Sequence, residues 1–137
     1  MTAVRLKNRL PAFPRLLGME LTATELDRVA ATLEVREEVT NGTGAIHGGA
    51  LMAFADTLGA IGTIINLPDG MQTTTLESKT NFIAPALIGM VLTGEATPMH
   101  KGRTTMIWQT RITRADGRLV AVVTQTQLIM PAAPKKA

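Results

Sequence analysis

Apolar and polar residues alternate along several segments of this chain, which predicts β-strands. Residues 30–39 are expected to form a strand with one buried and one wet face, because the face opposite its apolar positions is entirely polar. The expected inner face comprises Leu33, Val35, Glu37 and Val39. Four later strands are predicted over residues 72–83, 89–98, 103–113 and 119–130. In the Thr-rich first of these, one face would comprise Thr74, Leu76, Ser78, Thr80 and Phe82.

The pattern changes between residues 48 and 66, where apolar side chains recur at helical spacing and also cover the remaining sides. A helix that is apolar nearly all round is expected to be buried. Gly59 and Gly62 each lower the helix propensity by about 1 kcal/mol relative to Ala, so tertiary packing must hold this helix. Asp56 is its only charged residue. A carboxylate in such a segment needs a partner or a function.

The order of one strand, one buried helix and four strands predicts an α+β fold rather than alternating βαβ units. The economical arrangement is a long central helix wrapped by a curved antiparallel β-sheet. Turns are expected at residues 67–70 and 115–118, and a helical turn within residues 15–20. We expect a single domain over residues 1–137, with an N-terminal arm at about 1–14 and a frayed tail at about 131–137.

Composition narrows the possible functions. The chain has no cysteine, which excludes disulfides, thiolate metal sites and cysteine nucleophiles. Only 3% of residues are aromatic and the formal net charge is +3, with the basic residues scattered. Neither a nucleic-acid partner nor a membrane partner is therefore expected, whereas a phosphate-bearing small molecule is compatible with the charge. The N-terminus lacks the apolar region of a secretory signal, so a cytoplasmic location is expected.

His47, Gly48 and Gly49 stand where the helix begins. Free backbone N–H groups and the positive end of the helix dipole stabilise negative charge there, and glycine lets a ligand approach the backbone. Such a site can hold a thioester or ester carbonyl as it becomes an oxyanion. The structural alternative is that the two glycines only make a tight turn.

Asp56 could act as a nucleophile or as a general base for water. Its structural alternative is a carboxylate satisfied by a threonine or a backbone N–H. Eight residues of helix separate Gly48 from Asp56, a distance of about 12 Å. One carbonyl carbon cannot lie close to both groups of the same chain. If both act on one substrate, Asp56 must come from a second subunit, across a two-fold axis that pairs antiparallel helices.

Other candidates are weaker. Asn41 could orient water or a carbonyl, but it also suits a turn before Gly42. His47 could serve as a base or fix the loop through a hydrogen bond to the backbone. Thr75 by itself is an ordinary strand residue, and the basic pair Lys101 and Arg103 could bind phosphate or form a solvated hairpin. With only two histidines in the chain, no metal site is expected.

Taken together, these residues resemble the hotdog-fold acyl-CoA thioesterases of the phenylacetate-pathway, PaaI-like type. The resemblance covers residues 11–131 and includes the spacing N-x5-HGG-x6-D from Asn41 to Asp56. It also includes LLGMEL at 16–21, NFIAP at 81–85 and HKGRTT at 100–105. The order and spacing of the pieces carry the resemblance, since each alone is weak.

The resemblance implies hydrolysis of an acyl- or aryl-acyl-CoA to a free acid and coenzyme A. The Gly48 N–H would polarise the thioester carbonyl, with His47 holding the loop and Gly49 also in the substrate site. Asp56 of the partner chain would be the nucleophile or general base, with Asn41 and Thr75 orienting the carbonyl or water. The turn between Asp56 and Thr75 is one residue longer than in some relatives.

The resemblance also implies that Lys101 and Arg103 contact the phosphates of coenzyme A. No separate cofactor is implied, because coenzyme A belongs to the substrate. It further implies a homodimer with a continuous sheet and shared active sites, often paired into a homotetramer.

Two other functions compete with this one. The first is a non-catalytic hotdog protein that binds acyl-CoA, which would not need Asp56 in its apolar helix. The second is a hotdog dehydratase, which would carry a longer, proline-containing motif after the histidine. A small α+β oligomer without any ligand is the structural alternative.

Overall fold

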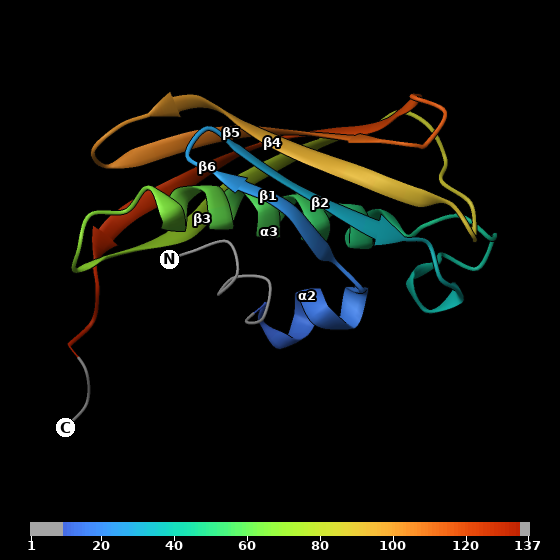
Figure 1. The fold of residues 1–137 in the computed structure, drawn as a ribbon, viewed down its shortest axis with the longest axis horizontal. Coiled ribbons are helices and arrows are strands. Elements are labelled where there is room, and N and C mark those ends of the chain that lie inside the picture. The colour runs from blue at the N-terminus through green and yellow to red at the C-terminus, as the bar shows by residue number, and fades with distance from the viewer. Residues whose placement is uncertain (1–9, 135–137) are drawn as a thin grey trace.

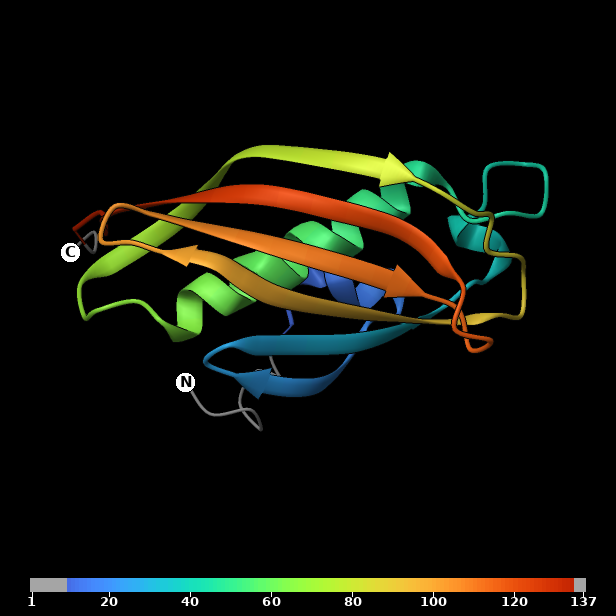
Figure 2. The ribbon, with the colours of Figure 1, turned by 90° about the horizontal axis from the view of Figure 1, so that it is seen from above.

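The computed structural model of the protein describes residues 10–134, which form one antiparallel sheet curved around a long helix (Figures 1 and 2). The six strands follow the order β1-β2-β4-β5-β6-β3 across the sheet. In chain order they are β1 (Glu20–Glu25), β2 (Arg28–Glu34), β3 (Met71–Phe82), β4 (Val91–Lys101), β5 (Thr105–Thr113) and β6 (Leu119–Pro131).

The central helix α3 (Gly48–Ile65) lies along the concave face of the sheet, and the short helix α2 (Ala12–Leu17) packs against α3 from the other side (Figure 1). Helix α3 is long and apolar enough to cross a membrane, but half of it is buried in this fold. The apolar residues on nearly all sides of α3 are therefore typical of a core helix. The predicted α+β fold, with a central helix wrapped by a curved antiparallel sheet, is confirmed.

Several boundaries differ from the predictions at the N-terminal side of the sheet. Strand β1 was not predicted, because its alternation is weak and Leu21 is its one buried residue. Strand β2 starts at Arg28 and ends at Glu34, whereas we expected a strand over 30–39. The chain instead continues through a 3-10 turn, η1 (Glu37–Val39). That turn leaves Val39 buried and Glu37 exposed, so alternation alone mispredicted the backbone of this segment.

The helical turn expected within 15–20 lies earlier, at α2. Pro11 caps it, and Gly18 ends it at φ 85°, in the left-handed region that glycine adopts without strain. Residues 12–14 of the expected arm thus belong to a helix, and Pro131 of the expected tail belongs to β6. Residues 1–9 of the arm and 135–137 of the tail lie outside the described residues.

A β-bulge in β3 corrects the predicted faces of that strand. Thr75 pairs with Gln127 and Glu77 pairs with Thr126, so Leu76 is the extra residue. Leu76 is 58% exposed rather than sharing an inner face with Ser78. Because a bulge shifts the alternation by one position, Thr75 and Ser78 both face inward on either side of it. Two-residue periodicity does not reveal such an insertion.

Helix α3 approaches the sheet closely because glycines stand at the contacts. A Cβ atom at Gly59 would lie 2.3 Å from the amide carbon of Gln125, and one at Gly62 would lie 2.7 Å from the ring of Trp108. Both distances are too short for a real Cβ contact, so both side chains occupy space that only glycine leaves. Trp108 is fully buried and donates its indole N–H to Oγ1 of Thr63 at 3.0 Å. The close packing of α3 against the sheet thus depends on glycine at these two positions.

Candidate functional site

His47 organises the start of α3. It is the N-cap residue, and its Nδ1 accepts a hydrogen bond from the Gly49 N–H at 2.7 Å. Its carbonyl oxygen accepts from the N–H groups of Ala50 and Leu51. Of the first helical N–H groups, that of Gly48 has no hydrogen-bond partner within residues 10–134. A free N–H at the positive end of an 18-residue helix is suited to a negatively charged oxygen.

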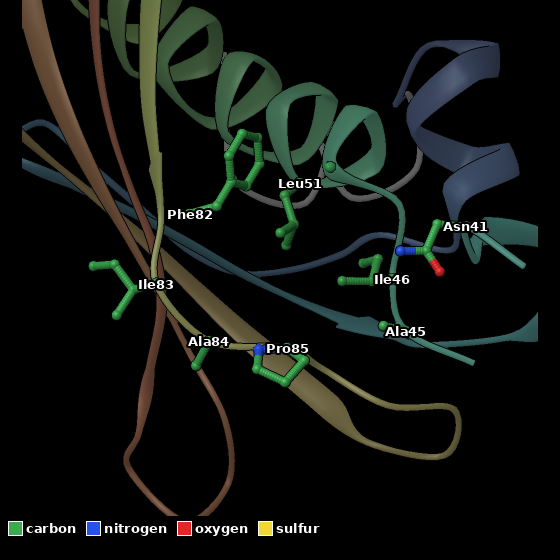
Figure 3. Close-up of a pocket in the computed structure, with 9 residues that line it drawn as sticks. Asn41, Ala45, Ile46, Leu51, Phe82, Ile83, Ala84 and Pro85 are labelled. Carbon is green, nitrogen blue, oxygen red and sulfur yellow. The ribbon is translucent and has the colours of Figure 1, made fainter. Parts of the chain in front are cut away.

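The Gly48 backbone borders an open pocket of about 370 Å³ beside the start of α3 (Figure 3). Figure 3 shows Ile46, Leu51 and Phe82 projecting toward this space from three different segments. A Cβ atom at Gly48 would lie 3.1 Å from the Phe82 ring, so the glycine keeps the pocket floor open. The lining residues are Asn41, Ala45, Ile46, Gly48, Leu51, Phe82, Ile83, Ala84 and Pro85. The pocket therefore offers an apolar wall next to the free N–H of Gly48.

Asn41 also lines this pocket, but part of its side chain is engaged in the loop. Its Oδ1 accepts hydrogen bonds from the backbone N–H of Thr43 at 3.0 Å and from the Thr43 hydroxyl at 2.6 Å. This is the Asx-turn geometry typical of asparagine in loops. The amide NH2 group is the part of Asn41 left for a ligand. The expected turn role is thus present, and the role toward a carbonyl or water stays a prediction.

Asp56 lies near the middle of α3 and faces the polar side chains of two neighbouring strands. Its Oδ1 accepts from the Thr75 hydroxyl at 2.6 Å and from Nε2 of Gln125 at 3.3 Å. Nε2 of Gln125 is also 3.3 Å from the Asp56 backbone oxygen. Oδ2 of Asp56 has no hydrogen-bond partner in the described part of the chain. One oxygen of this carboxylate is held and the other is free to act.

A chain of hydrogen bonds continues from Thr75 along the sheet. Oγ1 of Thr75 accepts from Nε2 of Gln127 at 2.6 Å. Oε1 of Gln127 lies 3.0 Å from the hydroxyl of Thr73, which is also 2.8 Å from the Leu128 carbonyl oxygen. The bulge at Leu76 and the cross-strand pairing of Thr75 with Gln127 place these side chains next to one another on the inner face of the sheet. Asp56 and Thr75, both named from the sequence, are therefore brought together.

Sequence reasoning missed Gln125 and Gln127, although both are fully buried. They share the inner face of β6 with the apolar residues Val123 and Ile129. The sequence does contain a sign of them: two glutamines, in QTQ at 125–127, stand at the positions of an otherwise apolar strand that alternation assigns to its inner face. Buried polar side chains require hydrogen-bond partners, so this pair could have been identified as part of a polar site.

The structure separates the two halves of the expected site within one chain. Gly48 and Asn41 border the pocket, whereas Asp56 is not among the residues that line it. The eight-residue separation along α3 corresponds to about 12 Å. Gly49 lies on a different side, in a second hollow with Phe13 and Leu17, and its N–H is already donated to His47. A site that uses both Gly48 and Asp56 needs two chains.

The basic residues near 100–105 divide into two kinds. Nζ of Lys101 pairs with the Asp27 carboxylate and is 3.3 Å from the Leu26 carbonyl oxygen and 3.2 Å from Oδ1 of Asn66. It therefore ties β4 to the β1–β2 turn and to the C-cap of α3. Arg103 lies exposed in the β4–β5 turn, with no ion pair among the described residues. Within residues 10–134, no three His, Asp or Glu side chains gather as a metal site.

Comparison with known proteins adds an independent line of observation. A family model for the thioesterase superfamily matches residues 43–121. Thioesterase HI1161 from Haemophilus influenzae has a similar structure, with a TM-score of 0.88 and 27% identity over 96% of this chain and 92% of that chain. A hypothetical thioesterase from Streptococcus pneumoniae, solved with coenzyme A, has a TM-score of 0.77 and 28% identity over 85% of this chain and 88% of that chain.

The PaaI protein of the Escherichia coli phenylacetic acid degradation operon also has a similar structure. Its TM-score is 0.85 over 95% of this chain and 92% of that chain. At 22% identity, this likeness shows the fold alone. The matched residues 43–121 include Gly48, Asp56 and Thr75 but not Asn41, Gln125 or Gln127.

Proposed function

This chain belongs to the thioesterase superfamily and is a thioester hydrolase, and we propose that its substrates are acyl- or aryl-acyl-CoA thioesters. The resemblance to hotdog-fold thioesterases is confirmed, including the fold that it implied. Coenzyme A in the related Streptococcus pneumoniae structure supports the substrate class. The observation that carries the proposed chemistry is the Asp56 carboxylate, which has one oxygen held by Thr75 and the other free.

In the proposed reaction the thioester carbonyl lies in the pocket beside Gly48. The free N–H of Gly48, at the positive end of α3, donates to the carbonyl oxygen as negative charge develops on it. The amide NH2 group of Asn41 lies on the same pocket and can orient the carbonyl or the attacking water. His47 keeps the loop in place through its bond to Gly49.

Asp56 of the partner chain supplies the second half of the proposed site. Oδ2 either accepts a proton from a water molecule that attacks the carbonyl carbon, or attacks that carbon itself. In both routes the carbon–sulfur bond breaks and coenzyme A leaves as a thiolate that takes up a proton. In the first route the attacking water provides the second oxygen of the acid. In the second route an anhydride forms between the acyl group and Asp56, and water then hydrolyses it to the free acid and restores the Asp56 carboxylate. The shared site supports a homodimer, and a homotetramer of two such dimers is the larger assembly that the family resemblance implies.

The substrate proposal also assigns a contact for the coenzyme A phosphates. Arg103 is exposed and free of ion pairs in the described residues, so its guanidinium is available for a phosphate. Lys101 was expected to share that role, but its ammonium group is already engaged with Asp27, Leu26 and Asn66. We therefore propose Arg103 as the principal contact of the two.

Free-thiol release from a panel of aliphatic and aryl acyl-CoAs tests the proposed function, with wild type compared with Asp56→Asn and Asp56→Ala. Loss of the carboxylate is expected to lower kcat by about 10²–10⁴-fold, the usual contribution of a general base. Asp56→Asn keeps the size of the side chain, and thermal unfolding of both variants checks that they fold. Turnover of no acyl-CoA, or full activity of Asp56→Asn, would contradict the proposal.

A further inference from the structure

Gln127 is a buried amide that reaches Asp56 through an intermediate hydroxyl. Its side chain is 0% exposed on β6, and its Nε2 lies 2.6 Å from Oγ1 of Thr75. Thr75 in turn lies 2.6 Å from Oδ1 of Asp56. On the far side, Oε1 of Gln127 is 3.0 Å from the Thr73 hydroxyl. Gln127 also lies outside the residues matched by the thioesterase family model.

The ionised Asp56 carboxylate fixes the direction of the hydrogen bonds that run from it through Thr75 to Gln127. An ionised carboxylate can only accept, so the single proton of the Thr75 hydroxyl must point to Asp56. Oγ1 of Thr75 is then left as an acceptor, which requires the NH2 end of Gln127 to face it. The carbonyl end of Gln127 consequently faces Thr73, whose hydroxyl can donate to it. A reversed Gln127 amide would compete with Asp56 for the Thr75 proton.

We propose that Gln127 is a positioning residue for the reaction: it orients the Thr75 hydroxyl as a donor to Oδ1 of Asp56 and so leaves Oδ2 for the substrate or water. This inference rests on the proposed function of Asp56. The Thr73 hydroxyl lies beside the carbonyl end of Gln127 and is also 2.8 Å from the Leu128 carbonyl oxygen. Gln127 acts through Thr75, because the structure gives it no hydrogen bond to Asp56 itself.

The inference makes a prediction for two variants that remove the Gln127 donor in different ways. In Gln127→Glu, a carboxylate replaces the donor and would accept the Thr75 proton, which withdraws that proton from Asp56. In Gln127→Leu, the donor is absent and the Thr75 hydroxyl is free to rotate. Both variants are therefore expected to lower kcat, although they differ in charge and polarity.

The deciding experiment is a double-mutant cycle on wild-type protein, Gln127→Leu, Thr75→Val and the double variant, measured with an acyl-CoA that the wild type hydrolyses. Gln127→Leu is expected to lower kcat about tenfold or more, because the hydrogen bond from Thr75 to the charged Asp56 is then no longer oriented, with KM changed less than about twofold. In the Thr75→Val background, Gln127→Leu should cause no further loss of kcat, because the group it orients is already absent.

Thr63→Val is the matched control for a merely structural effect. It removes a buried acceptor, the partner of the Trp108 indole, on the same helix but away from Asp56. It should lower the melting temperature and leave kcat unchanged. If Gln127→Leu does not fold, Gln127→Glu takes its place in the cycle.

Three outcomes separate the possibilities. Wild-type kcat in the Gln127 variants, while Asp56→Asn is inactive, would overturn this inference and leave the proposed function standing. If the losses of kcat in the two single variants add in the double variant, the inference would also be overturned, because Gln127 would then act independently of Thr75. Full activity of Asp56→Asn would instead overturn the proposed function, and the role of Gln127 with it.

Discussion

The hydroxyl of Thr75 lies 2.6 Å from Oδ1 of Asp56, although 19 positions separate the two residues in the sequence. Thr75 reaches the helix because the bulge at Leu76 keeps it on the inner face of β3, opposite Gln127. The carboxylate in the apolar helix thus has a hydrogen-bond donor supplied by the sheet. That donor holds one oxygen and determines which side of the carboxylate remains free.

Thr75→Val should reduce activity more than Thr75→Ser, because serine retains the hydroxyl that donates to Asp56. A hydrogen bond to a charged group contributes about 1.5–3 kcal/mol, so kcat of Thr75→Val should fall roughly tenfold to a hundredfold. Steady-state kinetics with an acyl-CoA substrate measures this difference. Equal activity of the two variants would show that the hydroxyl has no part in the reaction.

Gly59→Ala and Gly62→Ala form a matched pair on α3. In both, the new methyl group meets a buried side chain, so each should destabilise the fold by about 1–3 kcal/mol. Only Gly59→Ala displaces Gln125, which donates to Asp56, and only this variant should also lower kcat. Gly62→Ala displaces Trp108 and should leave kcat unchanged in the folded protein. Denaturant unfolding and kinetics on the same samples separate the two effects.

Mixing two inactive variants should restore activity if the site is shared between subunits. Gly48→Pro removes the proposed oxyanion donor yet suits the first helical position, and His47, at φ −67° and ψ 135°, already has a backbone conformation allowed before proline. Co-expression with Asp56→Ala should give about one quarter of wild-type activity, because random pairing makes half of the dimers mixed and each mixed dimer keeps one intact site.

Gly48→Ala is the control for that experiment, because it introduces the same Cβ atom beside Phe82 but keeps the N–H. It should retain much more activity than Gly48→Pro. No recovery of activity in verified mixed dimers would contradict a site that is shared between subunits.

Arg103 and Lys101 should differ in their effect on coenzyme A recognition. Arg103→Ala should raise KM for an acyl-CoA about two- to fivefold, in keeping with the modest energy of an exposed charge contact. It should not alter KM for an acyl-N-acetylcysteamine thioester, which has no phosphate. Lys101→Met should lower the melting temperature slightly, through loss of its contacts with Asp27 and Asn66, without affecting KM. A rise in KM for Lys101→Met would instead support the predicted role of Lys101 in phosphate binding.

Asp116, in the β5–β6 hairpin, should titrate at unusually low pH. Hydrogen bonds from the Arg114 side chain and the Arg118 backbone N–H hold the pKa of this carboxyl below its usual range. Since the folded pKa is the lower one, the contribution to stability is present above the unfolded pKa and is lost as the pH falls through the folded value. NMR titration of Asp116 in wild type and Arg114→Met should show the midpoint rise in the variant.

The sequence by itself determined the central helix, five of the six strands (β2 with a misplaced end) and the position of the unusual carboxylate. These features depend on local periodicity, on the glycine and proline turns and on a single charge among apolar residues, all of which can be read from neighbouring positions. It also identified Asp56 and Thr75 as candidates, although only a resemblance linked them to each other. The eight-residue separation of Gly48 and Asp56 was sufficient to argue for two subunits.

Tertiary structure alone decided how these residues meet. The bulge at Leu76, the pairing of Thr75 with Gln127 and the engagement of Lys101 with Asp27 join positions far apart in the chain, and local patterns do not encode which of them become neighbours. Leu76 was predicted to share a face with Ser78, because alternation cannot reveal an inserted residue. The roles of Gln125 and Gln127 became visible only once the sheet placed them against Asp56 and Thr75, because the role of a buried amide depends on the groups to which it hydrogen-bonds.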